Sequence, residues 1–421
     1  MSVTPAWRGA LSRHWTALAL LCWTAVCFWT DSPSRARRSW FFFPQGARLL
    51  FSGPYGRHVA PGGLHLYANY PYLQIGPAAF TVAQAVMHLG PNGGVVAAEL
   101  TMTAIGLATL GLIRRVTVTV RPELADDPWL RWTYLSGGAA FMATWEVLSV
   151  VFGHLDDCLA LLFAMLALWA VVRRRPVPAG LALGLSVDSK PWALVFLPML
   201  VLAGAPQGWL MTTRAGDVLR SGATAFRTGW RACLLAGAAM AAVIVAAWLP
   251  FVVADPGTLS AARYTIVNMP DSALRLLGVT TTRTPSWDRP AQVALGCLLG
   301  GLALWRRRWP AIVLLGVGAR IVLDPAARGY YTAGVMLGAL LWDLLGTKRP
   351  FPLWSLVTFC ALWLVPLSTQ NPAIRAEARL WLVVAFTAAL LLAPASWYWR
   401  AGNSGPAETG EPEAVPDPVA T

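Results

Sequence analysis

Long apolar runs separated by short polar clusters dominate the chain, and they predict helices that cross a membrane. A helix needs about 20 mainly apolar residues to span a bilayer. We expect twelve such segments, several of them short for a full span: 15–30, 94–113, 132–151, 158–172, 178–190, 191–205, 233–254, 291–305, 309–323, 331–346, 353–368 and 380–398. The predicted fold class is an all-α polytopic membrane protein.

Basic clusters at the ends of these segments predict their orientation, because cytoplasmic loops of membrane proteins are enriched in Lys and Arg. All clusters fall on one side if the twelve segments alternate: 114–115, 173–175, Arg214, Arg220, Arg227, Arg231, 306–308, 348–349 and Arg400. Both termini then lie in the cytoplasm. The apolar stretch 77–90 does not span in this arrangement, and its flanking Pro and Gly residues favour an interfacial helix on the outer side.

The ends of the chain give further expectations about its domains. No small-x-small cleavage site follows the first apolar run, so we expect an uncleaved helix and not a signal peptide. Residues 1–400 are predicted to form a single transmembrane domain with a long outer loop, 31–93. The tail 401–421 is acidic and rich in Pro and Gly, which predicts a disordered cytoplasmic segment.

Composition supports the membrane assignment and excludes several classes of protein. Of the 421 residues, 56% are hydrophobic and 13% are charged, and the mean hydropathy is +0.53, which is too apolar for a soluble globular protein. The arginines behind the net charge of +13 sit between apolar runs, so we expect membrane lipids and no nucleic acid as partners. No Walker A, dinucleotide-binding, zinc-protease or serine-hydrolase motif is present. The heavy use of Ala, Arg, Gly and Trp is typical of a GC-rich bacterial genome, so the expected location is a bacterial plasma membrane.

Ionisable residues gather at the outer ends of the predicted helices. They are His154, Asp156, Asp157, Asp188, Lys190, Arg320 and Asp324. Each costs at least about 2.5 kcal/mol at membrane depth, so their gathering predicts a polar cavity. Arginine also breaks the orientation rule on this side, at Arg35, Arg37, Arg38, Arg48, Arg57, Arg263, Arg275, Arg283 and Arg289. The planar guanidinium suits phosphate and indicates a phosphorylated substrate, with contact to anionic lipid headgroups as the alternative.

Asp31 is the candidate catalytic residue. It follows the first predicted helix directly and is the only acidic residue before Glu99. A lone carboxylate at the boundary between membrane and water suits a general base that takes the proton of an acceptor hydroxyl. The alternative is a residue that only solvates the end of the helix.

His154, Asp156 and Asp157 are candidates for binding substrate. Adjacent helical residues point about 100° apart, so both carboxylates face one site only if the helix breaks, which Gly153 permits. Contact with a sugar or a metal ion is then expected, and capping of a helix N-terminus is the alternative. A divalent metal is compatible with this pattern but is not indicated by it, so no metal ligand is assigned.

Lys190 lies inside an apolar hairpin and needs a partner there. The partner is either Asp188, two residues earlier, or the phosphate of a substrate. Arg320 and Asp324 are spaced i and i+4, so they are able to pair with each other. We include Lys190, Arg320 and Tyr330 among the residues expected to bind substrate.

His65, Tyr67 and Tyr70 belong to a segment rich in aromatic and hydrogen-bonding groups that directly precedes 77–90. Tyrosines provide both a stacking face and a hydroxyl, which suits a sugar. An aromatic belt at the lipid headgroups has a similar composition and is the alternative. These three residues complete the predicted substrate-binding set.

Across residues 15–345 the chain resembles the GT-C membrane glycosyltransferases that use polyprenyl-phosphate sugars, and within them the mannosyltransferase-like glycosyltransferase family 87. The likeness lies in Asp31 after the first helix, in Tyr70-Pro71-Tyr72-Leu73 before an apolar helix, in Gly153-His154-Leu155-Asp156 where the family has Gly-Gln-x-Asn, and in the glycine-rich helix from Gly180 to Lys190-Pro191. The resemblance implies a GT-C-like bundle of about twelve transmembrane helices with interfacial helices on the outer face. It also implies that Asp31 is the catalytic base and that Lys190, with an arginine, holds the lipid phosphate.

We therefore expect an inverting hexosyltransferase that moves a sugar, mannose being the first candidate, from a polyprenyl-phosphate donor to a lipid or glycan acceptor at the outer face. The base activates the acceptor and cations stabilise the leaving phosphate, so no nucleotide or redox cofactor is needed. The rival hypothesis is a transporter or flippase of a lipid-linked anionic substrate. Transporters often carry internal repeats and paired broken helices, and the absence of a clear repeat in this sequence favours the enzyme.

Overall fold

The computed structural model describes residues 6–31, 39–53, 59–122, 125, 127–205, 218–325, 329–347 and 351–394. Within these ranges the protein is built from helices, together with one isolated β-bridge between Val267 and Arg283. The predicted all-α class is therefore confirmed for the described residues. Several residues discussed above lie outside these ranges, namely the tail 401–421, Arg35, Arg37, Arg38, Arg57, Arg214, Lys348, Arg349 and Arg400.

The helices follow the predicted apolar segments along the chain. The first half supplies α1 (Ala6–Asp31), α2 (Phe42–Phe51), η2 (Gly63–His65), α3 (Leu66–Asn69), α4 (Pro77–Val86), α5 (Pro91–Val120), α6 (Pro128–Glu146), η4 (Val147–Val151), α7 (Leu155–Val172), α8 (Pro176–Ser189), η5 (Pro191–Phe196) and α9 (Pro198–Ala203). The second half supplies α11 (Val218–Ala254), η7 (Pro256–Arg263), α12 (Ala273–Leu276), α13 (Asp288–Trp305), η8 (Trp309–Ala311), α14 (Ile312–Leu323), η9 (Gly329–Tyr331), α15 (Thr332–Leu345), α16 (Leu353–Phe359), η10 (Cys360–Leu364), α17 (Val365–Ser368) and α18 (Pro372–Leu392). Proline opens α5, α6 and α8, where its missing N–H leaves no helical hydrogen bond unmade.

Three helical stretches of the described chain are long and apolar enough to cross a membrane: Gly94–Val120, Leu155–Val172 and Gly229–Ala254. Trp15–Asp31, Pro77–Val86, Trp309–Leu323 and Leu353–Ser368 form shorter apolar helices. The structure thus agrees with a membrane protein, while the count of twelve spans stays a prediction. α4, at ten residues, is about 15 Å long and too short to span.

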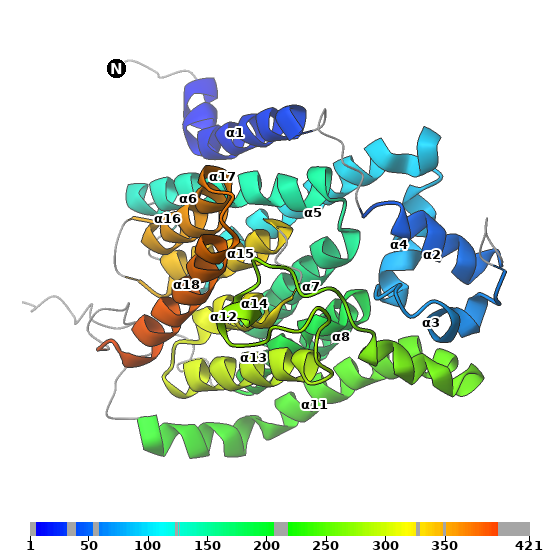
Figure 1. Ribbon diagram of the computed structural model, residues 1–421. Coiled ribbons are helices and arrows are strands. Elements are labelled where there is room, and N and C mark those ends of the chain that lie inside the picture. The colour runs from blue at the N-terminus through cyan, green and yellow to red at the C-terminus, as the bar shows by residue number, and fades with distance from the viewer. Residues whose placement is uncertain are drawn as a thin grey trace, which may run out of the picture.

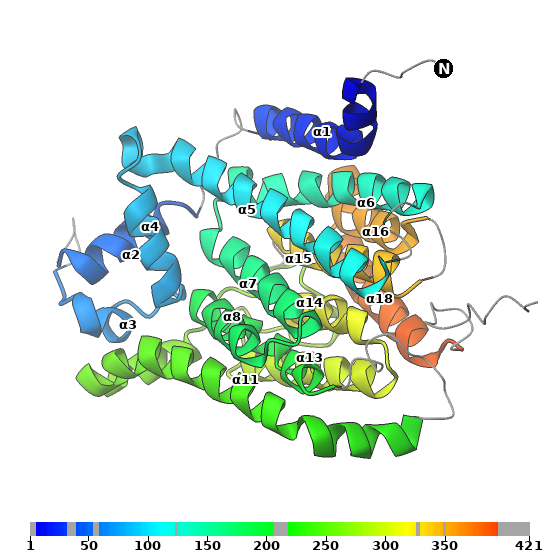
Figure 2. The same cartoon turned by 180° about the vertical axis from the view of Figure 1, so that it is seen from behind.

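The long helices lie side by side in a bundle, and α2, α3 and α4 lie together at one end of it (Figures 1 and 2). α7 packs between α5 and α8, and α15 packs against α6, α14 and α16. Every residue of α14 and α15 is buried, so these two helices form the centre. α11 packs along α8 and leaves large apolar side chains such as Leu234 and Val253 exposed, as a helix that faces lipid would.

Two helical hairpins, α7–α8 and α13–α14, close with the same kind of turn. Three arginines follow the first helix of each, and the middle one adopts a left-handed backbone, with φ 60° at Arg174 and 58° at Arg307. The N–H of Arg175 donates back to Ala170 O at 2.9 Å, and Arg308 makes the equivalent bond, which satisfies carbonyls at the helix end. Each hairpin therefore returns to the end where it began, which is opposite its arginine turn.

Gly180→Ala is expected to lower the free energy of unfolding by about 1–3 kcal/mol, because α8 and α11 touch at this glycine. A Cβ atom at Gly180 would lie 2.0 Å from the carbonyl oxygen of Ala236, so the two backbones must separate. Gly237 on α11 is the matched control, since a Cβ atom there meets nothing within 4 Å. Gly237→Ala is expected to be neutral or to stabilise by up to about 1 kcal/mol. Unfolding of the detergent-solubilised protein measures both, and equal effects would contradict this close packing.

Candidate functional site

A break between α6 and α7 brings three ionisable side chains together. After α6 the chain forms the π-helical turn η4, and Gly153 then takes a left-handed backbone with φ +68°, which favours glycine. α7 begins at Leu155, so His154 precedes its first turn while Asp156 and Asp157 lie within it. Both carboxylates can face one site only if the helix breaks before them. This break is present.

Each of the two carboxylates is buried and bonded to a cation. Lys190 Nζ donates to Asp156 Oδ2, and Asp156 Oδ1 accepts the backbone N–H of Asp157 at 2.9 Å. Asp157 Oδ1 accepts from Trp192 Nε1 at 2.7 Å and from Arg320 Nη1 at 3.0 Å. Asp156 therefore accepts an N–H of the first helical turn and also forms an ion pair, while the N-cap residue of α7, His154, makes no side-chain cap among the described residues.

Lys190 follows the end of α8 and reaches across to α7. Its backbone is extended, with φ −150° and ψ 113°, as is usual for a residue before proline. The partner is Asp156, 34 residues earlier in the chain, and not Asp188, which was one of the two expected partners. The packing of α7 against α8 sets this choice, because it brings the start of one helix next to the end of the other.

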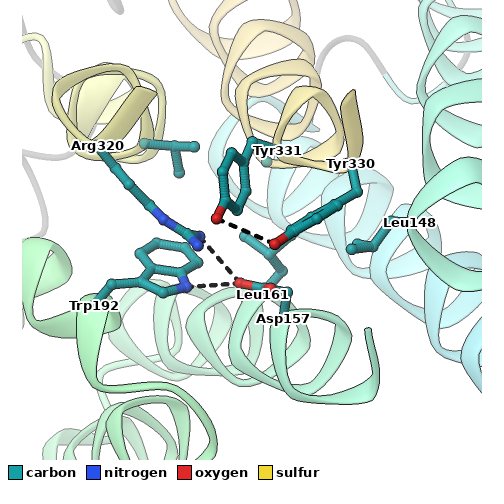
Figure 3. Close-up of a pocket in the computed structure, with 9 residues that line it drawn as sticks. Leu148, Asp157, Leu161, Trp192, Arg320, Tyr330 and Tyr331 are labelled. Atoms are coloured by element: carbon teal, nitrogen blue, oxygen red, sulfur yellow. Dashed lines mark hydrogen bonds and ion pairs between the residues drawn. The ribbon is translucent and has the colours of Figure 1, made fainter. Parts of the chain in front are cut away.

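Arg320 is the centre of a second set of contacts (Figure 3). Its guanidinium lies 4.2 Å from the ring centroid of Trp192 and 4.1 Å from that of Tyr331, a cation–π arrangement on two rings. It donates to Asp157, and its Nε lies 3.6 Å from Asp324 Oδ2, so the expected i, i+4 pair is present beside a partner from α7. Side chains from α7, η5 and η9 therefore fix this one residue of α14.

A small cavity lies beside these contacts. Its lining residues are Leu148, Asp157, Leu161, Trp192, Val317, Arg320, Tyr330, Tyr331 and Gly334. The polar ends of Asp157, Arg320 and Tyr330 converge in it (Figure 3). The sequence analysis missed Trp192 and Tyr331, and the available signal was their position directly next to the Lys190-Pro191 string and to Tyr330.

His154 joins the cluster through both of its ring nitrogens. Nε2 lies 2.9 Å from Ser39 Oγ, while Nδ1 lies 3.4 Å from Asp156 Oδ1 and 3.6 Å from Asp157 Oδ2. The imidazole also stacks on the ring of Tyr330, with 3.8 Å between centroids. A proton on Nδ1 would face Asp156 Oδ1, the nearer of the two oxygens, while Asp157 Oδ2 lies beyond hydrogen-bond distance.

Asp31 is the last residue of α1. α1 packs against α6 and η4, and the charge of Asp31 interacts with that of Glu146 at the end of α6. Ser39, where the described chain resumes after α1, contacts His154. The proposed base and the cluster thus belong to the same region of the fold, and no direct bond between them is recorded among the described residues.

His65, Tyr67 and Tyr70 lie in the group of short helices at the end of the bundle, and the two tyrosine hydroxyls are used inside it. Tyr67 is buried, and its hydroxyl donates to Ile75 O at 2.8 Å. The hydroxyl of Tyr70 donates to Ala60 O at 2.7 Å. Among the described residues, these three have no direct contact with the His154 cluster, so their expected part in substrate binding stays a prediction.

His65 ties together two segments that are far apart in the chain. Its Nδ1 lies 3.2 Å from Asp255 Oδ2 in the loop after α11, and both side chains are partly open to solvent. Asp255 also accepts the backbone N–H of Gly257 at 2.9 Å. The Gly257 N–H and then His65 favour the charged carboxylate, so the pKa of Asp255 lies below its usual value.

The outer arginines that the structure describes include two that hold loops in place. Arg289 donates to the side-chain oxygen of Gln74, which connects α13 to the segment before α4. Arg275 donates to the backbone oxygens of Thr280 and Asn268, both at 2.9 Å. These two arginines therefore hold loops in place.

Comparisons of this chain with protein-family models, with curated proteins and with solved structures gave no match. The geometry of the cluster is therefore the basis for a functional assignment. Its cations Lys190 and Arg320 suit an anion, its carboxylates suit a cation or hydroxyl groups, and His154 is placed to move a proton.

Proposed function

We propose that this protein is an integral membrane glycosyltransferase of a bacterial plasma membrane, with both termini in the cytoplasm. It transfers a hexose, mannose being the first candidate, from a polyprenyl-phosphate donor to a lipid or glycan acceptor at the outer face. The observation that carries the proposal is the pair of cations, half-buried Lys190 and buried Arg320, held by the adjacent residues Asp156 and Asp157.

The position of this pair also supports the proposal. The segment before α4 reaches the end of α8, where Gly76 N–H donates to Ser189 O at 3.1 Å, next to Lys190. The cations therefore lie at the end of the bundle where the short helices of the predicted outer loop gather (Figure 1). A lipid-linked phosphate at the membrane surface would reach them there, with its sugar near the aromatic rings of Tyr330 and Tyr331.

The proposed reaction is a single displacement with inversion. Asp31 takes the proton of an acceptor hydroxyl, and the acceptor oxygen forms a bond to the anomeric carbon. The bond from that carbon to the phosphate oxygen breaks, and the lipid phosphate leaves with the bonding electrons. Lys190 and Arg320 stabilise the negative charge that develops on it, so the step uses no nucleotide or redox cofactor.

Transport of a lipid-linked anion is the second candidate function, and one observation favours it. The hairpins α7–α8 and α13–α14 close with matching arginine turns and end at the same cluster, which is a repeat that the sequence alone did not reveal. α8 also stops at Lys190 before the chain continues in η5, so the site contains a discontinuous helix. Repeats and broken helices of this kind are common in transporters.

The purified protein in liposomes is expected to transfer radiolabelled mannose from polyprenyl-phosphate-mannose to a lipid acceptor. Lys190→Met is expected to reduce transfer about 10- to 100-fold, because it removes a charge-assisted contact to phosphate worth about 1.5–3 kcal/mol. Arg306→Met is the matched control, since Arg306 lies in the arginine turn at the opposite end of its hairpin. Movement of intact donor across the bilayer, without transfer from any hexose donor, would overturn the proposal in favour of transport.

A further inference from the structure

The ion pairs use one oxygen of each buried carboxylate and leave the other directed at His154. Asp156 binds Lys190 through Oδ2, and Asp157 binds Arg320 through Oδ1. Asp156 Oδ1 and Asp157 Oδ2 then lie 3.4 Å and 3.6 Å from His154 Nδ1. The three residues offer one ligand atom each, and these atoms lie within 4.8 Å of one another.

These separations fit the coordination of a metal ion. Nitrogen and oxygen ligands bind Zn²⁺ at about 2.0–2.2 Å, so two ligands of a tetrahedral site lie about 3.4 Å apart. Both distances from His154 Nδ1 agree with that edge. His154 Nδ1 therefore lies near the required spacing from one oxygen of each carboxylate, and the three ligand atoms lie within 4.8 Å of one another.

Asp157 Oδ2 provides a second and independent observation. Asp157 is 3% exposed, and its Oδ2 receives no hydrogen bond from any residue that the structure describes. A buried acceptor without a donor costs about 1–3 kcal/mol. A cation between this oxygen and His154 Nδ1 would remove that cost.

The surroundings of His154 also match those of a metal ligand. A histidine that binds a metal through one ring nitrogen usually bonds a second-sphere group through the other, which fixes the ring. His154 Nε2 lies 2.9 Å from Ser39 Oγ, and the ring stacks on Tyr330. Lys190 and Arg320 fix the two carboxylates as second-sphere groups, as Ser39 fixes the imidazole. Their positive charges lower the affinity of the site for a cation.

We propose that His154, Asp156 and Asp157 bind a divalent transition-metal ion. One imidazole and two carboxylates suit Mn²⁺ or Zn²⁺, with water in the remaining positions. On binding, the imidazole is neutral with its proton on Nε2, which can donate to Ser39 Oγ, and Nδ1 donates its lone pair to the metal. This site goes beyond the sugar transfer proposed above and does not depend on it.

Titration of the detergent-solubilised protein with Mn²⁺, followed by electron paramagnetic resonance of the free ion, tests the proposal. We expect one Mn²⁺ per chain, binding that is lost in His154→Ala, and affinity at least about tenfold lower in Asp157→Asn. Ser39→Ala is expected to lower the affinity about 10- to 100-fold through the loss of the second-sphere contact. Asp188→Asn, which removes a carboxylate at the same end of α8 outside the three ligands, is the matched control and should bind as the wild type does.

Lys190→Met gives a result that a purely structural cluster would not give. It removes the cation that competes for Asp156, so Mn²⁺ is expected to bind more tightly than in the wild type. Thermal unfolding with and without Mn²⁺ shows whether each variant is folded, since a bound ion raises the Tm of a folded protein. Folded wild type and folded Lys190→Met that bind neither Mn²⁺ nor Zn²⁺ would overturn the proposal. The readout is metal binding, so the result stands whether or not sugar transfer is observed.

Discussion

Arg320→Met is expected to lower the free energy of unfolding by about 3–5 kcal/mol. Arg320 and Asp157 are both almost fully buried, and removing one partner of a buried ion pair leaves an uncompensated charge inside the protein. The substitution also removes the contacts of the guanidinium with Trp192 and Tyr331. Methionine keeps much of the volume, so the loss reports the charge and not a cavity.

Equilibrium unfolding of the solubilised protein measures this effect against two comparisons. Arg306→Met removes a guanidinium that stacks on the exposed Trp305 at 5.6 Å, and it should cost less than about 1 kcal/mol. The double variant Arg320→Met/Asp157→Leu should be less destabilised than the sum of its single variants, because neither charge is then left alone. Additive single effects would contradict an ion pair as the source of the stability.

The hydrophobic pattern predicts where the helices lie better than where they end. The segment 94–113 was expected to stop at the basic pair 114–115, yet α5 continues to Val120. Arg114 and Arg115 are exposed while Val116 and Thr117 are buried, so one face of the helix stays packed beyond the arginines. A basic cluster therefore does not by itself end a helix: α5 continues past its pair, whereas α7 and α13 end directly before their arginine clusters.

The contacts within the site depend on helix packing, which the sequence does not contain explicitly. The gathering of His154, Lys190 and Arg320 at one end of the bundle follows from the alternation of helices and was predicted. The pairing of Lys190 with Asp156 joins residues 34 apart, and that of Arg320 with Asp157 joins residues 163 apart. Local spacing suggested partners nearer in the chain. It carries no information on which helices become neighbours.

The tyrosines of the segment before α4 show a second kind of information that the sequence lacks. Their composition suited a sugar site, and the sequence does not reveal whether a hydroxyl points outward or into the fold. Tyr67 and Tyr70 both donate to backbone oxygens of their own segment. The stretches around Ala60 and Ile75 lack regular structure, so their carbonyls need other donors, and these hydroxyls supply them.

Asp31→Asn is expected to reduce the rate of sugar transfer by about 10²- to 10⁴-fold, the usual contribution of a general base. The amide keeps the size of the side chain and removes its ability to take a proton. Asp156 and Asp157 are poor substitutes for this role, because Lys190 and Arg320 already occupy one oxygen of each. Single-turnover transfer with saturating acceptor measures the chemical step, and donor binding should stay unchanged.

Glu146→Gln is the matched control for Asp31→Asn. Glu146 is a buried carboxylate whose charge interacts with that of Asp31, and it is bonded to the hydroxyls of Thr103 and Ser149. Its neutralisation tests whether negative charge near the end of α1 is enough to affect the rate, and a change of at most a few-fold is expected. An equal loss in both variants would assign the effect to the local field, and a rate in Asp31→Asn above one-tenth of the wild type would remove Asp31 as the base. Only a large loss confined to Asp31→Asn, with donor binding intact, agrees with proton removal by this residue.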